Sequence, residues 1–147
     1  MKARLAAERE IPLVEDLGSG TLLDLYSAGT AGLPKAAFAP RRLAMGVDVV
    51  CLSGDKLMGG PQAGILLGRA DLIESMRRNP LARALRVDKL TIAALDATLD
   101  LLLDGSGPKE IPVLAGLRAD SGELEASAKR LLAELTPILG TNFQLDL

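Results

Sequence analysis

The sequence predicts an α/β protein, because short apolar runs alternate along it with amphipathic segments of helical period. Residues 47–52 and 64–67 are apolar runs of strand length, bounded by glycine. Over 88–103 and 121–135, apolar residues recur at three- and four-residue spacing, which predicts two amphipathic helices. With 147 residues, the chain has the length of one ordinary domain.

The first half of the chain is divided by glycine- and proline-containing loops. Here we expect, in order, the end of an amphipathic helix (1–9), a short buried strand (11–15), a loop (16–20), brief local order (22–26), a loop (29–34), one or two helical turns (40–45) and a strand (47–52).

The second half is predicted to be mostly helical. Here we expect a strand (64–67), a helix (71–78) stopped by Asn79-Pro80, the longest helix (88–103) ended by Asp104-Gly105, a linker (106–108), an extended or irregular segment (112–117), a helix (121–135) and the beginning of a strand (143–147). The last residues carry no stop signal, so we expect the chain to end inside a domain.

Composition excludes several classes of function. Aromatic residues make up 2% of the chain and the net charge is −2, which argues against a DNA-binding or other polyanion-binding surface. The absence of histidine removes Ser-His and Cys-His catalysis and most zinc sites, so we expect no metal. The single Cys51 cannot form an internal disulfide, and its apolar neighbours indicate a small core residue.

Two further absences concern location. No run of 18 apolar residues is present, so the sequence predicts no membrane span. No signal peptide is visible at the start, and we expect a cytoplasmic protein.

The most informative segment is a glycine-rich loop over 53–64, which reads SGDKLMGGPQAG. It places Lys56 just beyond one predicted strand, while Asp16 closes another, and the carboxyl ends of strands are where ligands bind in such sheets. A lysine that forms an aldimine and an aspartate that keeps the pyridine nitrogen protonated are what a pyridoxal phosphate enzyme requires. Ser53 is placed to donate to the cofactor phosphate, and Gly60 would let the backbone approach the ring or phosphate closely.

Three motifs together are similar to the bacterial selenocysteine synthase family, the L-seryl-tRNA(Sec) selenium transferases. They read VEDLGSG at 14–20, SGDKLMGGPQAG at 53–64 and NPLARALRVDKLT at 79–91. The resemblance covers roughly residues 11–104. It implies a partial large domain of the fold-type I pyridoxal phosphate-dependent transferases, which is the aspartate aminotransferase-like fold.

The resemblance also implies residue roles. Lys56 becomes the aldimine lysine and Asp16 the partner of the pyridine nitrogen, with Glu15 beside it as an open alternative. Arg83 and Arg86, three residues apart and so able to share a helix face, become candidates for recognising an anionic selenium donor. Members of this family convert L-seryl-tRNA(Sec) to L-selenocysteinyl-tRNA(Sec) with selenophosphate, through an aminoacrylyl intermediate.

The family protein is several times longer in its amino-terminal part. Residues 1–104 would therefore be the carboxy-terminal part of the cofactor-binding large domain. Residues 105–147 would be a linker and the truncated beginning of the small carboxy-terminal domain. The resemblance implies a homo-oligomer in the intact protein, and a fragment that is itself inactive.

Other interpretations remain open or are weaker. A related pyridoxal phosphate-dependent lyase acting on a small amino acid or amino sugar would share the lysine loop, and a non-catalytic interaction fragment is a further alternative. Residues 53–56 match the Ser-x-x-Lys signature of penicillin-binding enzymes, but the following Gly59-Gly60-Pro61 forbids the helix that this signature needs. Gly18-Ser19-Gly20 hints at a dinucleotide loop that lacks its third glycine.

Overall fold

The structure is a computed structural model that describes residues 2–25 and 35–139. It is an α/β arrangement, as the sequence predicts. The described elements, in order, are α1 (Lys2–Glu8), β1 (Val14–Asp16), the 3-10 turn η1 (Lys35–Ala37), α2 (Ala39–Ala44), β2 (Val49–Ser53), β3 (Gly64–Gly68), α3 (Ala70–Arg78), α4 (Pro80–Ala84), α5 (Lys89–Leu103), α6 (Gly107–Glu110), α7 (Pro112–Arg118) and α8 (Ser121–Leu139).

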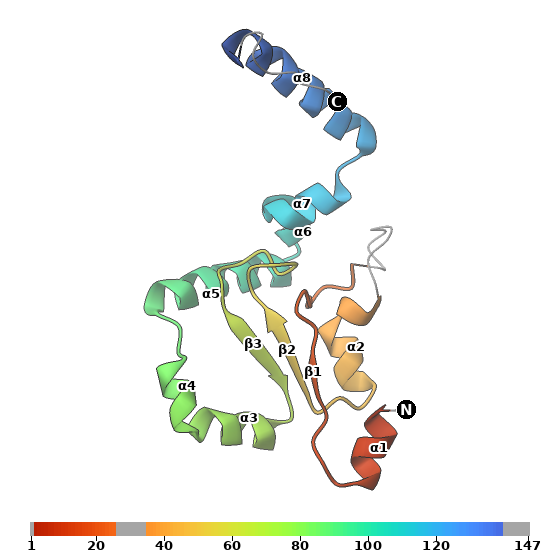
Figure 1. Ribbon diagram of the computed structural model, residues 1–147, viewed down its shortest axis with the longest axis vertical. Helices are drawn as coiled ribbons and strands as arrows, with labels where there is room; N and C mark the ends of the chain where they lie inside the picture. The colour runs from red at the N-terminus through yellow and green to blue at the C-terminus, as the bar shows by residue number, and fades with distance from the viewer. Residues whose placement is uncertain (1, 26–34, 140–147) are drawn as a thin grey trace.

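The three described strands form one sheet with β2 at its centre (Figure 1). β1 pairs with β2 in parallel, and β3 returns antiparallel with Ser53 opposite Gly64. The carboxyl ends of β1 and β2 and the start of β3 therefore lie at the same edge of the sheet. The loop that carries the lysine connects β2 to β3 at this edge, close to α5, α6 and α7 in Figure 1.

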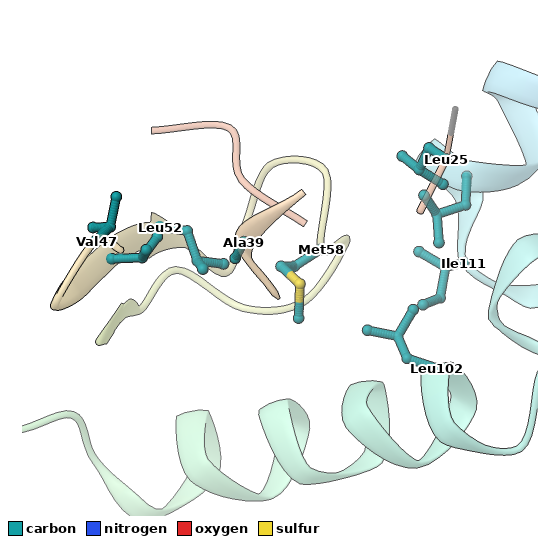
Figure 2. Packing of buried hydrophobic residues seen from close by; sticks show 9 residues of the cluster. Leu25, Ala39, Val47, Leu52, Met58, Leu102 and Ile111 are labelled. Carbon is teal, nitrogen blue, oxygen red and sulfur yellow. The ribbon is translucent and has the colours of Figure 1, made fainter. Parts of the chain in front are cut away.

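The core is aliphatic, as expected from a chain with so few aromatic residues. Met58, Leu114, Val49 and Val50 are its largest fully buried side chains. Met58 belongs to the lysine loop, and it shares one cluster with residues of the sheet, such as Val50, and with Leu102 of α5 and Ile111, which precedes α7 (Figure 2). The loop is therefore anchored in the core although it joins two strands at the edge of the sheet.

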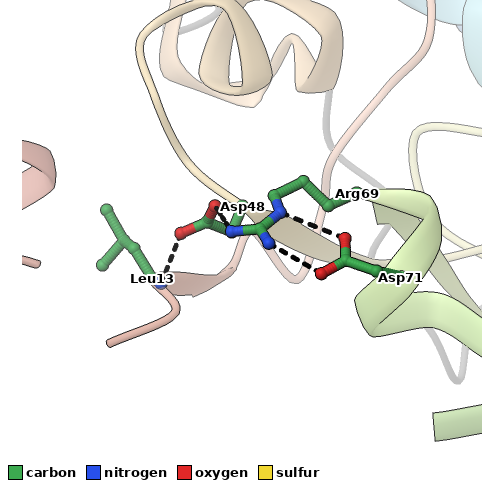
Figure 3. A network of polar contacts seen from close by, with 4 residues as sticks. All are labelled: Leu13, Asp48, Arg69 and Asp71. Atoms are coloured by element: carbon green, nitrogen blue, oxygen red, sulfur yellow. Dashed lines mark hydrogen bonds and ion pairs between the residues drawn. The ribbon is translucent and has the colours of Figure 1, made fainter. Parts of the chain in front are cut away.

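The opposite edge of the sheet is held by a polar cluster around Asp48 (Figure 3). The Asp48 carboxylate accepts a hydrogen bond from the Leu13 N–H at 2.8 Å and one from Arg69 Nη1 at 3.1 Å. Arg69 also contacts Asp71 at 2.7 Å through Nη2. Because these residues precede β1, precede β2 and follow β3, one carboxylate ties all three strands together.

Most elements lie where the sequence predicts them. The predicted helices at 1–9, 40–45, 71–78, 88–103 and 121–135 correspond to α1, α2, α3, α5 and α8, and the strands at 47–52 and 64–67 correspond to β2 and β3. Two predicted segments lie outside the described residues, namely the loop at 29–34 and the strand at 143–147. Tyr26, the last residue of the segment predicted to have brief local order, lies outside them as well.

Four expectations for individual elements are wrong. The first strand begins only at Val14 and is not buried, since Ile11 and Val14 are exposed. The predicted linker and extended segment are instead the short helices α6 and α7, each with a proline in its first turn, where a missing N–H costs no helical hydrogen bond. The longest described helix is α8 with 19 residues, against 15 in α5.

The helix α8 extends away from the sheet in Figure 1 and buries none of its residues. Across residues 2–25 and 35–139, no helix combines the length and the apolar character needed to cross a bilayer.

Candidate functional site

The candidate site lies where β1 and β2 end. The chain turns sharply after β2, because the Gly54 N–H donates to the Ala63 carbonyl at 2.8 Å and the Gly60 N–H donates to the Gly54 carbonyl at 2.8 Å. These bonds close the base of the loop and direct Lys56 outwards. The Lys56 side chain is exposed, and no ion pair to it is found among the residues that the structure describes.

Asp16 lies across from the lysine at the end of β1. Its carboxylate accepts the Gly18 N–H at 2.9 Å, which fixes the turn that follows the strand. Gly18 has φ +57°, and a Cβ added to it would lie 3.8 Å from Lys56 Nζ. The backbone after Asp16 therefore passes beside the lysine amine, and the structure brings these two predicted residues to one place.

Asp16 and Lys56 share the lining of two hollows. The first, of about 820 Å³, extends from them towards α7, and Gly60 contributes to its wall. The second, of about 1290 Å³, extends over the open face of the sheet towards the segment that joins α4 to α5, and Ser53 and Arg86 contribute to its wall. The amine and the carboxylate thus stand at the junction of the two spaces.

The pleat of β1 distinguishes the two adjacent carboxylates. Asp16 is level with Cys51 of β2 and Leu66 of β3, and all three line the second hollow. Glu15 points to the other face, as neighbours on a strand must. There it binds Arg42 of α2 through two hydrogen bonds, of 2.7 Å to Nε and 2.6 Å to Nη2.

The Arg42 guanidinium, chiefly through these hydrogen bonds, holds the pKa of Glu15 below its ordinary value of 4.5. Glu15 is therefore a charged partner of α2 on the far side of the sheet from the second hollow. The structure gives Asp16, and not Glu15, access to that hollow.

Ser53 and Gly60 both line the hollows at the site, and each also contacts a neighbouring residue of the protein. The Ser53 hydroxyl donates to Asp55 Oδ1 at 2.9 Å, so it would have to exchange this partner to hold a phosphate. A Cβ added to Gly60 would lie 3.0 Å from Thr98 Oγ1 and 3.2 Å from Thr98 Cγ2. A side chain at position 60 would therefore press on Thr98 of α5, so packing against this helix favours a small residue there.

The two arginines are not on one helix face, which corrects the sequence prediction. Arg83 lies in the last turn of α4, whereas that helix ends at Ala84 and Arg86 follows it in the connection to α5. Arg86 lines the second hollow together with Lys56 and Lys89, and Arg83 lines neither of the two hollows. Leu85 separates the helix from Arg86 and is its C-cap, with its N–H donating to the Leu81 carbonyl.

Cys51 differs from the core residue that the sequence predicts. It is only partly buried and lies beside Asp16 on the open face. Burial, and to a smaller degree the Asp16 carboxylate, raises the pKa of its thiol. A protonated thiol is a poor nucleophile, so the site does not offer thiolate chemistry.

Sequence reasoning missed three residues around the lysine loop. Gly18, Thr98 and Ile111 all contact it, and the last two come from helices or turns more than 30 residues further along the chain. The only signal for Gly18 was its glycine-rich setting, and Thr98 and Ile111 carried none. Within the described part of the chain, no group of three or more acidic or cysteine side chains could hold a metal ion.

The comparison with protein families identifies one match over nearly the whole chain. A family described as SelA, L-seryl-tRNA selenium transferase, matches residues 2–147. Two relatives called L-seryl-tRNA(Sec) selenium transferase, from Yersinia pestis (strain Pestoides F) and Yersinia pseudotuberculosis serotype O:1b (strain IP 31758), are each 47% identical over 146 residues. These residues are 99% of this chain and 31% of each relative, so the chain spans about a third of their length.

A comparison with solved structures finds a similar fold. The structure of a D-glucosaminate-6-phosphate ammonia-lyase matches 73% of this chain and 27% of its own, with a TM-score of 0.50 and 20% identity. At that identity the likeness concerns the fold and not the reaction.

Proposed function

Because this chain belongs to the L-seryl-tRNA selenium transferase family, we propose that it supplies the cofactor-holding lysine for conversion of L-seryl-tRNA(Sec) to L-selenocysteinyl-tRNA(Sec). The single observation that supports this role is the exposed Lys56 amine beside the turn after Asp16, at the junction of two hollows. An amine without an ion-pair partner can react with an aldehyde, and the space on both sides admits a flat cofactor and its substrate.

The residues present fit pyridoxal phosphate. When bound, this cofactor supplies an electron sink that allows a proton to leave the α-carbon of an amino acid. Lys56 would hold the cofactor covalently through Nζ, and Asp16 would keep its ring nitrogen protonated. Ser53 and the backbone at Gly60 would contact its phosphate or ring. The carboxylate of Asp16 suits its role because it faces the second hollow with one local hydrogen bond to the Gly18 N–H.

The substrate side of the proposal uses the cationic wall of the second hollow. Selenophosphate is an anion, and a guanidinium keeps its charge at any physiological pH. Arg86 lines this hollow, so it is the better placed of the two predicted arginines, and Arg83 would act only if a substrate or another part of the protein extended to α4. The seryl group would enter beside Lys56, and the tRNA would be bound by parts of the protein other than this acidic chain.

The proposal also includes the larger assembly. We assign residues 1–104 to the large domain of a fold-type I, aspartate aminotransferase-like enzyme and residues 105–147 to a linker and the beginning of its small domain. The exposed apolar side chains around α4 and the start of α5, such as Leu81, Leu85 and Leu90, fit a cytoplasmic homo-oligomer in which further protein covers them.

The test supplies the two thirds of the relatives' length that this chain does not span. In a chimera, the matching 146-residue segment of the Yersinia pestis relative is exchanged for the present sequence, and selenocysteinyl-tRNA formation is measured with seryl-tRNA(Sec) and selenophosphate. We expect turnover by the chimera, loss of turnover in Lys56→Arg, and normal turnover in Lys109→Arg, whose lysine lies in α6 outside both hollows.

A guanidinium keeps the positive charge of lysine but cannot form the bond to the cofactor. Turnover by the Lys56→Arg chimera at the rate of the Lys109→Arg chimera would contradict the proposal.

A further inference from the structure

The loop that carries Lys56 packs on residues of later helices, Thr98 of α5 and Ile111 at the start of α7. Met58 is fully buried in the cluster that contains Leu102 and Ile111 (Figure 2). Gly59 follows with φ +70°, and its N–H donates to the Lys56 carbonyl at 2.9 Å. The turn that positions the lysine backbone therefore ends on the surface formed by α5 and the start of α7.

The contact at Gly59 depends on one methyl group. A Cβ added to Gly59 would overlap Cγ2 of Ile111, and it would lie 2.9 Å from Cγ1 of Val113. Ile111 is 3% exposed and Val113 is 37% exposed. The surrounding core therefore holds the Ile111 side chain in place, whereas the Val113 side chain has solvent on one side. The other branch of the Ile111 side chain ends in Cδ1, which would lie 3.4 Å from a Cβ added to Gly107 at the start of α6.

The next residue is supported in the same way. Gly60 lies against the side chain of Thr98, which is buried and turns its hydroxyl back to the Ala94 carbonyl at 2.7 Å. This hydrogen bond satisfies the hydroxyl inside α5 and fixes the orientation of the methyl group. The two glycines are thus packed against two β-branched side chains, whose rotamers are restricted.

We propose that Ile111, with Thr98 beside it, is a positioning residue that fixes where the Lys56 amine stands. This inference rests on the proposed function for the identity of the reacting group. The packing contact itself can be tested without any cofactor. Ile111 acts through Gly59 on the turn that begins at Lys56, and it touches no reacting atom.

The experiment compares two conservative substitutions of Ile111 in the 147-residue chain by amide hydrogen exchange. Ile111→Val keeps Cγ2, the methyl that packs on Gly59, and removes Cδ1. Ile111→Leu keeps a similar side-chain volume and removes Cγ2. We expect exchange at the Gly59 and Gly60 amides to become about tenfold faster in Ile111→Leu and to change by less than about twofold in Ile111→Val.

The amides of β2 report global unfolding in the same experiment. If Ile111→Leu speeds those amides equally, the loop effect is read from Thr98→Ser, which removes the Cγ2 methyl near Gly60 and keeps the hydroxyl beside it. We expect that variant to speed the Gly60 amide and to leave β2 unchanged. Equal effects of the two Ile111 substitutions on the loop, or no effect of Thr98→Ser, would overturn the inference.

A second measurement links the packing contact to the lysine. In the chimera, pyridoxal phosphate is mixed with the protein, borohydride is added, and the fraction of Lys56 that is labelled is followed by peptide mass. We expect slower labelling in Ile111→Leu than in Ile111→Val. Failure of both variants and of the unchanged chimera to label would count against the proposed function, whereas equal labelling of the two variants would count against the positioning role alone.

Discussion

At the scale of single residues, the site depends on which of two neighbouring carboxylates faces the hollow. Glu15 and Asp16 are indistinguishable by charge and by position at the end of an apolar run. The strand pleat separates them, because Glu15 meets Arg42 under the sheet and Asp16 lines the hollow beside Lys56. The sequence leaves this choice open, since it does not show which face of a three-residue strand will be covered by α2.

This arrangement predicts different effects for two matched substitutions in the chimera. Asp16→Asn should lower turnover by about 10²-fold, because a neutral amide no longer stabilises a protonated ring nitrogen. Glu15→Gln should leave turnover within about twofold and lower the free energy of unfolding by about 1–2 kcal/mol through the weakened ion pair with Arg42. Turnover and urea unfolding measure the two effects, and a larger loss of turnover in Glu15→Gln would reverse the assignment.

The Asp48 carboxylate connects segments next to all three described strands. The Leu13 N–H, and next the Arg69 guanidinium, lower the pKa of its carboxyl below the ordinary value of 3.8. A carboxyl whose pKa is lower in the folded state stabilises that state fully above the ordinary pKa, and this stabilisation is lost as the pH falls through the lowered pKa. Asp48 should therefore contribute at neutral pH and cease to contribute in acid.

The test compares urea midpoints of the unchanged chain and of Asp48→Ala as a function of pH. We expect a constant difference between them from about pH 5 to 7, and a difference that shrinks below about pH 4. Asp71→Ala is the control, because Asp71 lies in α3 and contacts the same Arg69, whereas Asp48 also accepts the Leu13 N–H next to β1. A pH-independent difference, or an equally large effect of Asp71→Ala, would show that Asp48 does not tie the strands together.

At the scale of elements, the conformation of the lysine loop depends on the backbone angles of its glycines and on the side chains packed against them. Gly59 has both a positive φ and no room for a Cβ, Gly105 has φ +85° in open space, and Gly64 has open space without a positive φ. We expect Gly59→Ala to lower the free energy of unfolding by more than about 2 kcal/mol, Gly105→Ala by about 1 kcal/mol, and Gly64→Ala by less than about 0.5 kcal/mol.

Chemical denaturation of the three variants measures this order. The comparison separates strain from overlap, because Gly105→Ala carries only the strain of a left-handed backbone. If Gly59→Ala and Gly105→Ala were equally destabilised, the packing of the loop on Ile111 would be unimportant for stability.

Elements with a repeated apolar pattern were predictable, and those defined by distant contacts were not. The spacing of apolar residues predicted α5 and α8, and Asp88 begins α5 by accepting the Leu90 and Thr91 N–H groups. Residues 112–117, which begin with Pro112, carry too short an apolar pattern to predict a helix, so the sequence predicts an extended or irregular segment there. In the structure that proline starts α7, and Ile111 and Leu114 bury the segment against the core.

In the candidate site, too, features set by local sequence patterns were predictable and features set by distant contacts were not. Lys56 and Asp16 were predictable because glycine-rich turns follow apolar runs, and parallel strands bring such turns to one edge. Thr98 and Ile111 were not, because their roles arise only when α5 and α7 fold back over the loop. The position of Arg86 also depends on a helix end that three-residue spacing alone could not locate.

At the scale of the whole molecule, the chain combines a small sheet carrying the lysine with a long helix that stands away from it. The described part of α8 has no buried residue, although Leu124, Leu131 and Ile138 repeat at seven-residue intervals. Exposed apolar side chains also gather around α4 and the start of α5. Both features agree with a chain that matches about a third of the length of its relatives.

The central claim is that the Nζ atom of Lys56 is the group that bonds to the cofactor. The most direct measurement is to reduce the pyridoxal phosphate-loaded chimera with borohydride and to locate the modified lysine by peptide mass. The account predicts one cofactor per site, on Lys56, and no stable adduct in Lys56→Arg. Modification of another lysine, such as Lys89 in the same hollow, at the same level in both proteins would contradict it.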